Sequence, residues 1–332
     1  MRLLVVGCGS IGKRHLGNFQ ALGVEHLGAV DTREDRRVEV AERFGVTSLY
    51  GSVDDALAEG YNAVLAGVPT RFHSEVAEKA IASGAHVLVE KPLADRADGV
   101  EDLLEKARRN GLVVMVGYTY RFWPPLVRAK QAIDEGAIGR VVSAQIRFSE
   151  YLPDWHPWED YRSWFMADAE LGGGALLDES HTVDIARWFF GDVRSVFGFT
   201  GRVSGLEITA DDLAEMVLRF ESGAVAGVHM DIYGRSHRKE MLIQGEDGNL
   251  DWDFYANRVT LYRADSKATD VWEFDTDRNE MFLAEARHFL ECVEGRATPP
   301  VDGADGLETL KVLLAVRRSS QTGRVVELGA GA

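Results

Sequence analysis

A run of glycines between two apolar segments, at the very start of the chain, constrains the fold more than any other feature. The apolar, β-branched residues 3–6 lead directly into Gly7-Cys8-Gly9-Ser10-Ile11-Gly12. A helix-compatible stretch follows over residues 13–22, and a second apolar run ends on an acid, Asp31, nineteen residues after Gly12. This order of strand, glycine turn, helix, strand and acid is typical of the first unit of a dinucleotide-binding domain.

Each residue of the turn has a physical task in such a domain. Gly7 permits the tight turn, Gly9 lets the backbone approach a pyrophosphate, and Gly12 lets the helix pack against the strand. The first N–H groups of the helix, beginning at Ser10 and Ile11, and its positive dipole end would hold the phosphates. The alternative is a strand–turn–helix without a ligand, and the acid after the second strand argues against it. We therefore expect these five residues to contact a dinucleotide.

Asp31 indicates which dinucleotide to expect. A carboxylate at this place accepts hydrogen bonds from both ribose hydroxyls of NAD and repels the 2′-phosphate of NADP. Arginine is the usual partner of that phosphate, and Arg33, Arg36 and Arg37 follow closely. Charges of opposite sign alternate over residues 32–37, so a solvated helix face also explains these arginines. We expect NAD as the cofactor, with NADP as the alternative. In either case we expect Arg33 to lie beside the cofactor.

Length, charge and cysteine content limit the class of protein. A chain of 332 residues exceeds what one hydrophobic core usually supports, so we expect two domains. The net charge of −16 leaves no basic surplus to meet phosphates, which argues against nucleic acids and anionic membranes as partners. The two cysteines are too few for a disulfide framework, and no membrane-spanning run or signal peptide is recognised, which favours the cytoplasm.

Short apolar runs alternate with helical stretches over residues 1–120, which predicts a Rossmann domain, a doubly wound parallel sheet. Its strands are expected at residues 3–6, 27–30, 63–66, 86–89 and 112–116, with further helices at residues 72–83 and 97–110. Residues 121–332 predict an α/β domain with a mostly antiparallel sheet, because several runs alternate polar and apolar residues. These runs are residues 141–149, 193–200, 213–220, 224–231, 240–244 and 258–262, with helices at residues 124–135, 175–190, 278–294 and 304–320. The last helix is expected to pack back on the Rossmann domain.

Three further segments carry chemically active residues. Pro69, Thr70 and His73 follow one predicted strand, and Glu90-Lys91-Pro92 follows the next. Ligands bind beyond the carboxyl ends of the strands in an open parallel sheet, so we expect both segments to contact the cofactor. The third segment, in the second domain, is Gly172-Gly173-Gly174 with Asp178 and His181 shortly after it.

In these segments, in the glycine turn and in residues 117–122, the chain resembles the Gfo/Idh/MocA oxidoreductases. The family is named for glucose–fructose oxidoreductase, inositol dehydrogenase and a rhizopine-catabolism protein, and the resemblance covers essentially the whole chain. It implies a Rossmann domain plus an α/β domain with a large, open, mostly antiparallel sheet, which another subunit covers in homodimers or homotetramers. It also implies that a Lys and a His, helped by an Asp, oxidise a sugar or cyclitol hydroxyl with NAD(P). The matching residues here are Lys91, His181 and Asp178.

The chemistry of alcohol oxidation asks for the same residue types. A base must take the hydroxyl proton, which suits His181 because imidazole titrates near neutral pH. A cation must favour the developing alkoxide, which suits Lys91 at a strand end. Many relatives place the Asp four residues before the His, but that position is Leu177 here and Asp178 follows it. Asp178 can still share a helix face with the His or cap the helix, and Asp184 can orient the His instead.

Residues 151–162 hold five aromatic or imidazole rings among three acids and an arginine. Flat rings suit the C–H face of a sugar, and planar polar groups suit its hydroxyls. The residues expected to bind substrate are therefore Trp155, His156, Trp158 and Arg162, together with Arg121. A structural or subunit-contact loop is the alternative, because aromatic residues also favour interfaces. A metal site is another interpretation of Asp154, His156, Asp178 and His181. Their spacing matches no familiar metal-binding motif, so no metal is expected.

The sequence thus predicts an NAD(P)-dependent dehydrogenase that acts on a CH–OH group of a sugar, sugar derivative or cyclitol. A non-catalytic, dinucleotide-dependent sensor on the same fold is one alternative, and a redox-neutral glycosidase or epimerase that recycles NAD is another. We also expect a homo-oligomer, because the predicted helices are too few to cover both faces of the second sheet. Apolar residues expected on the uncovered face are Leu213, Val217 and Phe220, or Val225 and Val228.

Overall fold

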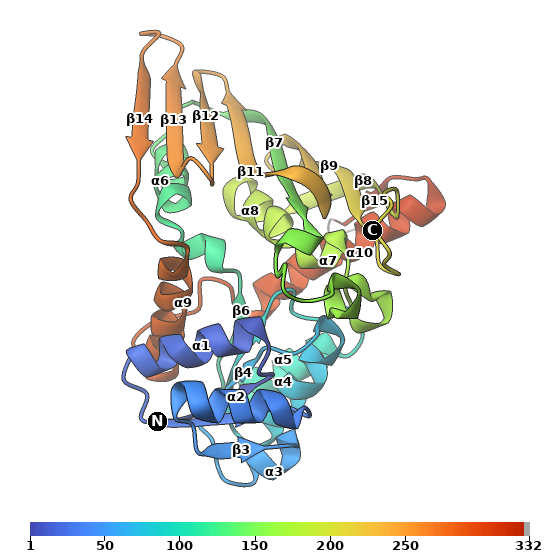
Figure 1. Ribbon diagram of the computed structural model, residues 1–332. Coiled ribbons are helices and arrows are strands. Elements are labelled where there is room, and N and C mark those ends of the chain that lie inside the picture. Colours follow the sequence, from blue (N-terminus) through green and yellow to red (C-terminus); the bar gives the residue numbers. More distant parts are fainter. Residues whose placement is uncertain (329–332) are drawn as a thin grey trace. The chain divides into compact units, whose positions relative to one another are not determined.

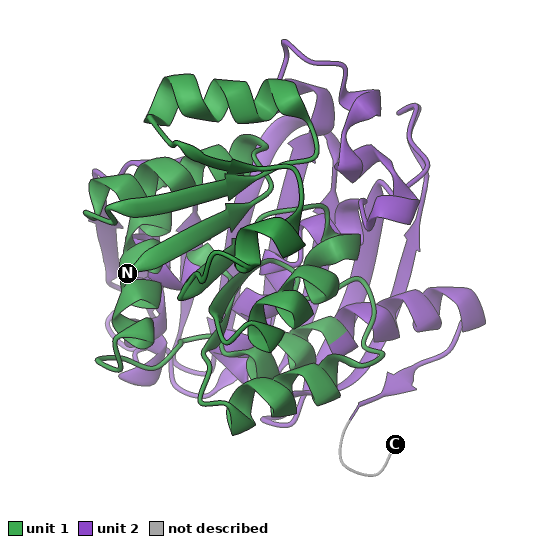
Figure 2. Ribbon diagram, turned by 90° about the horizontal axis from the view of Figure 1, so that it is seen from below, with its two compact units in different colours: residues 1–119, 278–310 green, residues 120–277, 311–332 purple. Residues whose placement is uncertain are grey.

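The computed structural model describes residues 1–328. The chain forms two compact units, which Figure 2 draws in different colours. Unit 1 contains Met1–Thr119 and Arg278–Leu310, and unit 2 contains Tyr120–Asp277 and the chain from Lys311 onward. A late segment of the chain therefore belongs to the same compact unit as the N-terminal segment.

Unit 1 is built on a six-stranded sheet in which all neighbouring strands are parallel. The strands are β1 (Arg2–Val6), β2 (His26–Val30), β3 (Ser48–Tyr50), β4 (Ala63–Ala66), β5 (His86–Glu90) and β6 (Val114–Gly117) (Figure 1). Their order in the sheet is β3-β2-β1-β4-β5-β6. The order reverses between β1 and β4, and this fold binds ligands in the crevice beyond the carboxyl ends of those strands.

Helices cover both faces of this sheet. One group consists of α1 (Ser10–Ala21), α2 (Glu34–Phe44) and α9 (Arg278–Val293), and the other of α3 (Val53–Leu57), α4 (His73–Ala82) and α5 (Val100–Arg109). The predicted doubly wound parallel sheet is confirmed. The sequence analysis missed β3, whose three residues are too short to establish a hydrophobic pattern and are only partly buried.

Unit 2 is built on a nine-stranded sheet in the order β14-β13-β12-β11-β7-β10-β9-β8-β15. Its strands are β7 (Val141–Tyr151), β8 (Val193–Gly201), β9 (Leu213–Phe220), β10 (Val225–Asp231), β11 (Tyr233–Gly245), β12 (Gly248–Asp253), β13 (Arg258–Arg263), β14 (Thr269–Glu273) and β15 (Val326–Glu327). Within residues 1–328, β10 and β7 are the only neighbouring strands of this sheet that pair in parallel, so the predicted mostly antiparallel sheet is confirmed. The prediction of six strands was wrong, because β12, β14 and β15 carried too little apolar signal.

The helices of unit 2 pack against its sheet at several places. Helix α6 (Pro124–Asp134) contacts β12 and β13, while α8 (His181–Phe190) contacts β7 and β10. Helix α10 (Gly303–Thr322) begins in unit 1 and ends in unit 2, where hydroxyls of its last turns accept hydrogen bonds from the backbone of β8. The single helix predicted for residues 175–190 is broken in two. Its first part is α7 (Ala175–Asp178), and Glu179 and Ser180 separate α7 from α8.

Large apolar side chains remain exposed along β8, β9 and β10. Phe197 is 50% exposed and Val217 is 47% exposed, and the two residues are direct partners across β8 and β9. Val225 is 37% exposed on β10. The expectation that Phe220 and Val228 lie on the same face is wrong, since they are 2% and 0% exposed. Each lies three residues from the exposed member of its strand, and side chains alternate between the two faces.

Within residues 1–328, no helix has both the length and the apolar character that are needed to cross a bilayer.

Candidate active site

The glycine turn between β1 and α1 has the shape that the sequence predicts. Gly7 has a φ of +95°, and a Cβ added to it would lie 2.3 Å from the carbonyl oxygen of Gly67. A Cβ on Gly12 would lie 1.8 Å from the carbonyl oxygen of Gly7, so the helix can approach the strand only because that atom is missing. At Gly9 the nearest atom to an added Cβ is Nη1 of Arg36, 3.9 Å away. The turn is therefore open at the position where a pyrophosphate would approach the backbone.

Asp31 follows β2 and is fixed by the backbone around it. Its side chain is almost fully buried, and Oδ2 accepts a hydrogen bond of 2.8 Å from the N–H of Cys8. Oδ1 accepts a bond of 2.9 Å from the N–H of Arg33. Each carboxylate oxygen has a second lone pair, so the group can still accept hydrogen bonds from a ribose. The acid therefore ties the second strand to the glycine turn.

The arginines after Asp31 have different surroundings. The guanidinium of Arg33 binds the carboxylate of Asp35, whereas Nη1 of Arg36 lies 3.6 Å from Oδ2 of Asp31. Arg36 is also the side chain closest to the open position at Gly9. The sequence predicts Arg33 as the arginine beside the cofactor. The geometry favours Arg36 for that place, and the contact of Arg33 stays a prediction.

The segment after β4 is fixed by a buried histidine. Pro69 precedes a single turn of 3₁₀ helix that starts at Thr70, and both belong to this strand end. The two ring nitrogens of His73 lie 2.9 Å from the carbonyl oxygen of Val68 and 2.8 Å from that of Pro92. Burial lowers the pKa of His73, although both carbonyls favour its charged form. His73 therefore joins two strand-end segments, and its direct contact with a cofactor stays a prediction.

Glu90, the last residue of β5, holds the backbone of Lys91. Its Oε1 lies 2.8 Å from Nε2 of His15, and its Oε2 accepts a hydrogen bond of 3.2 Å from the N–H of Lys91. Burial alone would raise the pKa of Glu90. The hydrogen bond and charge of His15, followed by the charge of Lys91, bring this pKa below its ordinary value. The carboxylate therefore connects α1, which follows the glycine turn, to the predicted catalytic lysine.

The predicted base and its acid lie on either side of the break between two helices. Gly173 and Gly174 precede α7, and a Cβ on either would collide with neighbouring oxygens at 2.3 Å and 2.5 Å. Asp178 ends α7 and His181 begins α8, and both side chains are partly buried. The ring of His181 meets that of Tyr120 edge to face, with 4.8 Å between the ring centres. The glycine triplet thus lets α7 pack closely, and a bend separates Asp178 from His181.

Arg121 and Asp184 form a buried ion pair. Nε and Nη2 of Arg121 donate hydrogen bonds of 3.1 and 2.8 Å to the two carboxylate oxygens of Asp184. Only 10% of the arginine side chain and none of the aspartate side chain is exposed. Such a two-point pair is strong and directional. Asp184 therefore holds Arg121, and the substrate contact expected of Arg121 stays a prediction.

A buried charge network that was not predicted from the sequence lies next to this pair of helices. Nζ of Lys239, on β11, lies 2.9 Å from Glu150 and 3.9 Å from Glu179. The same ammonium lies over the rings of Phe148 and Tyr120. Because Glu179 lies between Asp178 and His181, this network borders the predicted base. A lysine inside an alternating strand run was its only sign in the sequence.

The aromatic segment after β7 divides into packed and exposed residues. Trp155 packs against a buried apolar cluster around Leu152 and Trp164. The guanidinium of Arg162 binds Asp160 and Glu207 at the surface. His156 meets the rings of Trp158 and Trp164, and Trp158 is 75% exposed. These contacts favour the structural interpretation for Trp155 and Arg162, whereas His156 and Trp158 keep surfaces that a ligand could meet.

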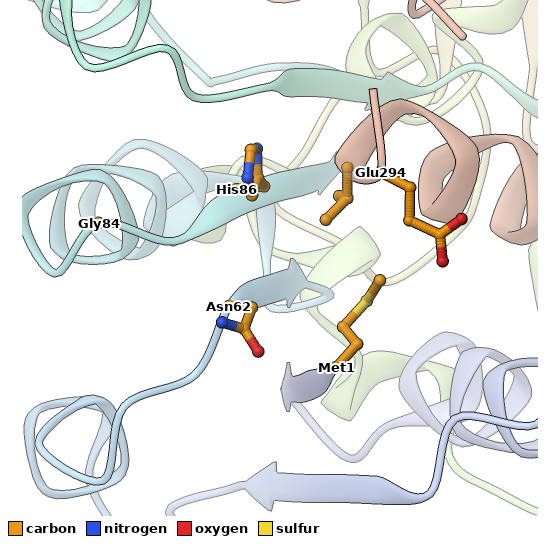
Figure 3. Close-up of a pocket in the computed structure, with 6 residues that line it drawn as sticks. Met1, Asn62, Gly84, His86 and Glu294 are labelled. Carbon is orange, nitrogen blue, oxygen red and sulfur yellow. The ribbon is translucent and has the colours of Figure 1, made fainter. Parts of the chain in front are cut away.

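A hollow in unit 1 lies at the amino ends of the strands of its sheet, opposite the ends that the cofactor is expected to meet (Figure 3). Met1, Asn62 and His86 line it at the amino ends of β1, β4 and β5, and Gly84 and Glu294 complete its labelled rim. Ligands of this fold bind at the carboxyl ends of the strands. The hollow is therefore distinct from the predicted cofactor site.

Two family models match the chain. Residues 1–118 match an oxidoreductase family with an NAD-binding Rossmann fold, and residues 126–251 match the GFO/IDH/MocA C-terminal domain. The chain is 28% identical to the myo-inositol 2-dehydrogenase of Thermotoga maritima, over 99% of this chain and 98% of that protein. It is also 28% identical to the D-xylose 1-dehydrogenase (NADP(+)) 2 of Haloferax volcanii, over 98% of each. The crystal structure of the WlbA dehydrogenase from Bordetella pertussis, in complex with NADH and UDP-GlcNAcA, has a TM-score of 0.83 and 25% identity over 99% of each chain.

Proposed function

Because the chain belongs to the Gfo/Idh/MocA family of NAD-binding oxidoreductases, we propose that it oxidises a secondary hydroxyl of a sugar, sugar derivative or cyclitol. The observation that carries this proposal is the attachment of Lys91 to Glu90 and, through Glu90, to the helix after the glycine turn. A nicotinamide dinucleotide bound at that turn supplies the acceptor for the hydride. Relatives that act on myo-inositol and D-xylose support the class of substrate.

We assign the proton transfer to His181 and the electrostatic role to Lys91. The imidazole takes the hydroxyl proton as the carbon–oxygen double bond forms, and the ammonium stabilises the negative charge that develops on oxygen. Asp178 is proposed to bind a substrate hydroxyl or to orient His181. The remaining proposed substrate contacts are Arg121, His156 and Trp158, whereas Trp155 and Arg162 are assigned to the structure of the loop because of their packing and ion pairs. Trp158 is the most accessible member of this set.

For the cofactor we propose a preference for NAD over NADP. The buried carboxylate of Asp31 is held by two backbone N–H groups, so it cannot turn away from a 2′-phosphate. Arg36 is the feature that favours the opposite preference, because its guanidinium lies beside the acid and the glycine turn. The ratio of kcat/KM for the two cofactors measures this preference directly.

A substrate panel tests the main proposal against its two alternatives. Sugars, sugar acids and cyclitols are offered with NAD, and the bound cofactor is quantified before and after the reaction. Growth of NADH absorbance with one of the substrates is the expected result. Tight NAD binding with no turnover of any kind would favour a sensor. Substrate conversion without net NADH, by protein that keeps its cofactor through gel filtration, would favour redox-neutral chemistry.

We further propose a homo-oligomer in which the exposed face of the unit 2 sheet contacts a second copy. Phe197, Phe199 and Val217 are each about half exposed and lie on adjoining strands. Single exposed apolar residues are common, but a group of them on one sheet face is typical of an interface. Light scattering should give an even multiple of 36.7 kDa, and a mass of one chain would contradict the proposal.

We also propose that the protein acts in the cytoplasm. Its two cysteines are buried and form no disulfide, which supports a reducing compartment.

A further inference from the structure

Two charged side chains lie on the face of the unit 2 sheet that otherwise forms its core. Lys239 on β11 shares this face with Met241 and Ile243, which are 1% and 0% exposed. Glu150 on β7 shares it with the buried Phe148, which is the direct partner of Lys239 across the two strands. The alternation of both strands predicts apolar residues at these two places, and a buried charge is costly unless it is paired. The proposed reaction does not explain why these charges are present.

The ammonium of Lys239 contacts two buried carboxylates. Nζ lies 2.9 Å from Oε2 of Glu150, whose Oε1 accepts a hydrogen bond of 2.5 Å from the hydroxyl of Tyr255. Glu150 is thereby fixed at both oxygens, and it fixes the position of the ammonium. Nζ also lies 3.9 Å from Oε2 of Glu179, whose side chain is 4% exposed. Opposite charges at that distance attract each other strongly where little water screens them, so the ammonium holds the side chain of Glu179 in the core.

The backbone of Glu179 forms the break between α7 and α8. Its N–H donates a hydrogen bond of 3.0 Å to the carbonyl oxygen of Ala175, the first residue of α7. Its carbonyl oxygen accepts bonds of 3.0 Å from both the N–H and the hydroxyl of Thr182, the second residue of α8. The position of the first turn of α8, which His181 begins, therefore depends on the position of Glu179.

The ring of Tyr120 is a second link between the same ammonium and His181. It meets the imidazole edge to face, with 4.8 Å between the ring centres. Nζ of Lys239 lies over the same ring, 5.9 Å from its centre. All of these residues belong to unit 2, in which α8 packs beside β7 (Figure 1). Lys239 is therefore linked to the predicted base through the backbone of Glu179 and through the ring of Tyr120.

We propose that Lys239 is a positioning residue for His181 in the dehydrogenase reaction. Its ammonium, fixed by Glu150, holds Glu179 in the core, and Glu179 in turn fixes the start of α8, so that the imidazole keeps one orientation towards the substrate hydroxyl. The inference rests on the proposed role of His181 as the base. It adds a residue of β11, which no motif marks, to the support of that base.

Two substitutions and their combination test this role. Lys239→Met keeps most of the side chain and removes its charge, whereas Glu179→Gln keeps the shape of the partner and removes its charge. Misplacing a catalytic group lowers turnover steeply, so each variant should lower kcat by about tenfold or more, with KM and NAD affinity within about threefold of wild type. If Lys239 acts through Glu179, the double variant should be no slower than the slower single variant, whereas independent roles would multiply the two losses.

The melting temperature distinguishes positioning from simple stabilisation. Lys239→Met leaves two buried carboxylates without their cation and should melt below wild type. The double variant leaves one, so it should melt above Lys239→Met while its kcat stays as low. Glu179→Gln keeps the Lys239–Glu150 pair, so it remains informative even if Lys239→Met does not fold. Ile243→Ala is the control, because it opens a cavity on the same face of β11 and should lower the melting temperature but not kcat.

A second readout needs no substrate. Hydrogen exchange of the Thr182 N–H reports its bond to the carbonyl oxygen of Glu179, and the N–H of Gly191, bound to the carbonyl oxygen of Arg187, is a reference at the other end of α8. We expect the ratio of the two exchange rates to rise about tenfold in Glu179→Gln and in the double variant. In Ile243→Ala the ratio should stay at the wild-type value, because that substitution does not touch the break between α7 and α8.

Several results would overturn the positioning role. They are wild-type kcat or a wild-type exchange ratio in Glu179→Gln, and losses that multiply in the double variant. A kcat that recovers with the melting temperature in the double variant, or an equal loss in Ile243→Ala, would also overturn it, because turnover would then follow stability. A wild-type protein that oxidises no member of the panel, while Thr182 exchanges as expected in the variants, would refute the dehydrogenase proposal and leave the support of His181 intact.

Discussion

Substitution of Gly9 by alanine should weaken dinucleotide binding without loss of stability. The backbone of Gly9 has a φ of −72° and a ψ of −166°, which alanine adopts freely. Its new methyl group would have no protein atom closer than 3.9 Å. The change from Gly to Ala at a compatible position stabilises by about 0.4–1 kcal/mol, so the melting temperature should rise by about 1–3 °C. The methyl group would instead occupy the space through which a pyrophosphate approaches the turn.

The loss of binding free energy in Gly9→Ala can be estimated from the close packing of the methyl group against the pyrophosphate. An extra methyl group in a close-packed contact costs about 1–3 kcal/mol, which corresponds to binding that is weaker by about fivefold to 150-fold. Two other glycines of the same segment provide matched comparisons. Gly12→Ala would bring a Cβ to 1.8 Å from the Gly7 oxygen, so α1 must shift away from β1 and both stability and binding should fall. Gly17→Ala makes only an ordinary contact of 3.4 Å with Phe44 and should affect neither adversely.

Titration of NADH fluorescence measures binding, and a thermal melt of each variant measures stability. We expect affinity and stability to change independently. Gly9→Ala should lower NADH affinity alone, Gly12→Ala should lower both affinity and melting temperature, and Gly17→Ala should lower neither. Wild-type NADH affinity in Gly9→Ala would refute the assignment of the pyrophosphate to this turn. A wild-type melting temperature in Gly12→Ala would refute the close contact between the helix and the turn.

Three further predictions concern the chemistry, the cofactor and the assembly. Lys91→Ala and His181→Ala should each lower kcat by about a hundredfold or more while NAD affinity stays close to wild type, and near-full turnover in either variant would remove that residue from the mechanism. Asp31→Ala should weaken NAD binding and narrow the kcat/KM ratio between NAD and NADP, because the lost carboxylate accepts the ribose hydroxyls and repels the phosphate. If the unmutated enzyme already prefers NADP, Arg36 rather than Asp31 determines the choice of cofactor. Phe197→Glu should shift the mass in light scattering towards one chain, because a charge buried at the sheet face is costly, and an unchanged mass would exclude this face as the contact.

Much of the fold could be predicted because the relevant signals are local. The run before the glycine turn and the strand before Asp31 are dense in apolar residues, and both were predicted within two residues of their observed bounds. Strands β12 and β14 escaped prediction because Asp, Asn and Gly interrupt their apolar pattern, and pairing with β13 stabilises both of them. The break at Glu179 was equally invisible, since residues 175–190 have one continuous helical pattern.

In the candidate site, the sequence predicted the candidate functional residues better than it predicted their hydrogen-bond and ion-pair partners. The residue types at Asp31, Lys91 and His181 could be selected from spacing and chemistry, but the partner of each side chain could not. Asp184 was a candidate to orient His181, yet its carboxylate binds Arg121 at two points. Arg33 was selected over Arg36 by its distance in sequence, yet Arg36 is the one that approaches Asp31. Such choices depend on how helices and strands face one another, which a single sequence does not encode locally.

His15 illustrates why function in this chain depends on residues that no motif marks. It lies three residues after Gly12, so the periodicity of the helix turns it towards the sheet on the same side as that glycine. There its ring contacts Glu90 and packs against Phe282, which lies on α9 one turn before Glu285. The close packing of α1 on β1, which Gly12 allows, thus also brings His15 to the Glu90 carboxylate, which holds the backbone of Lys91. A substitution that lifts α1 from β1 should therefore disturb the lysine as well as the cofactor turn.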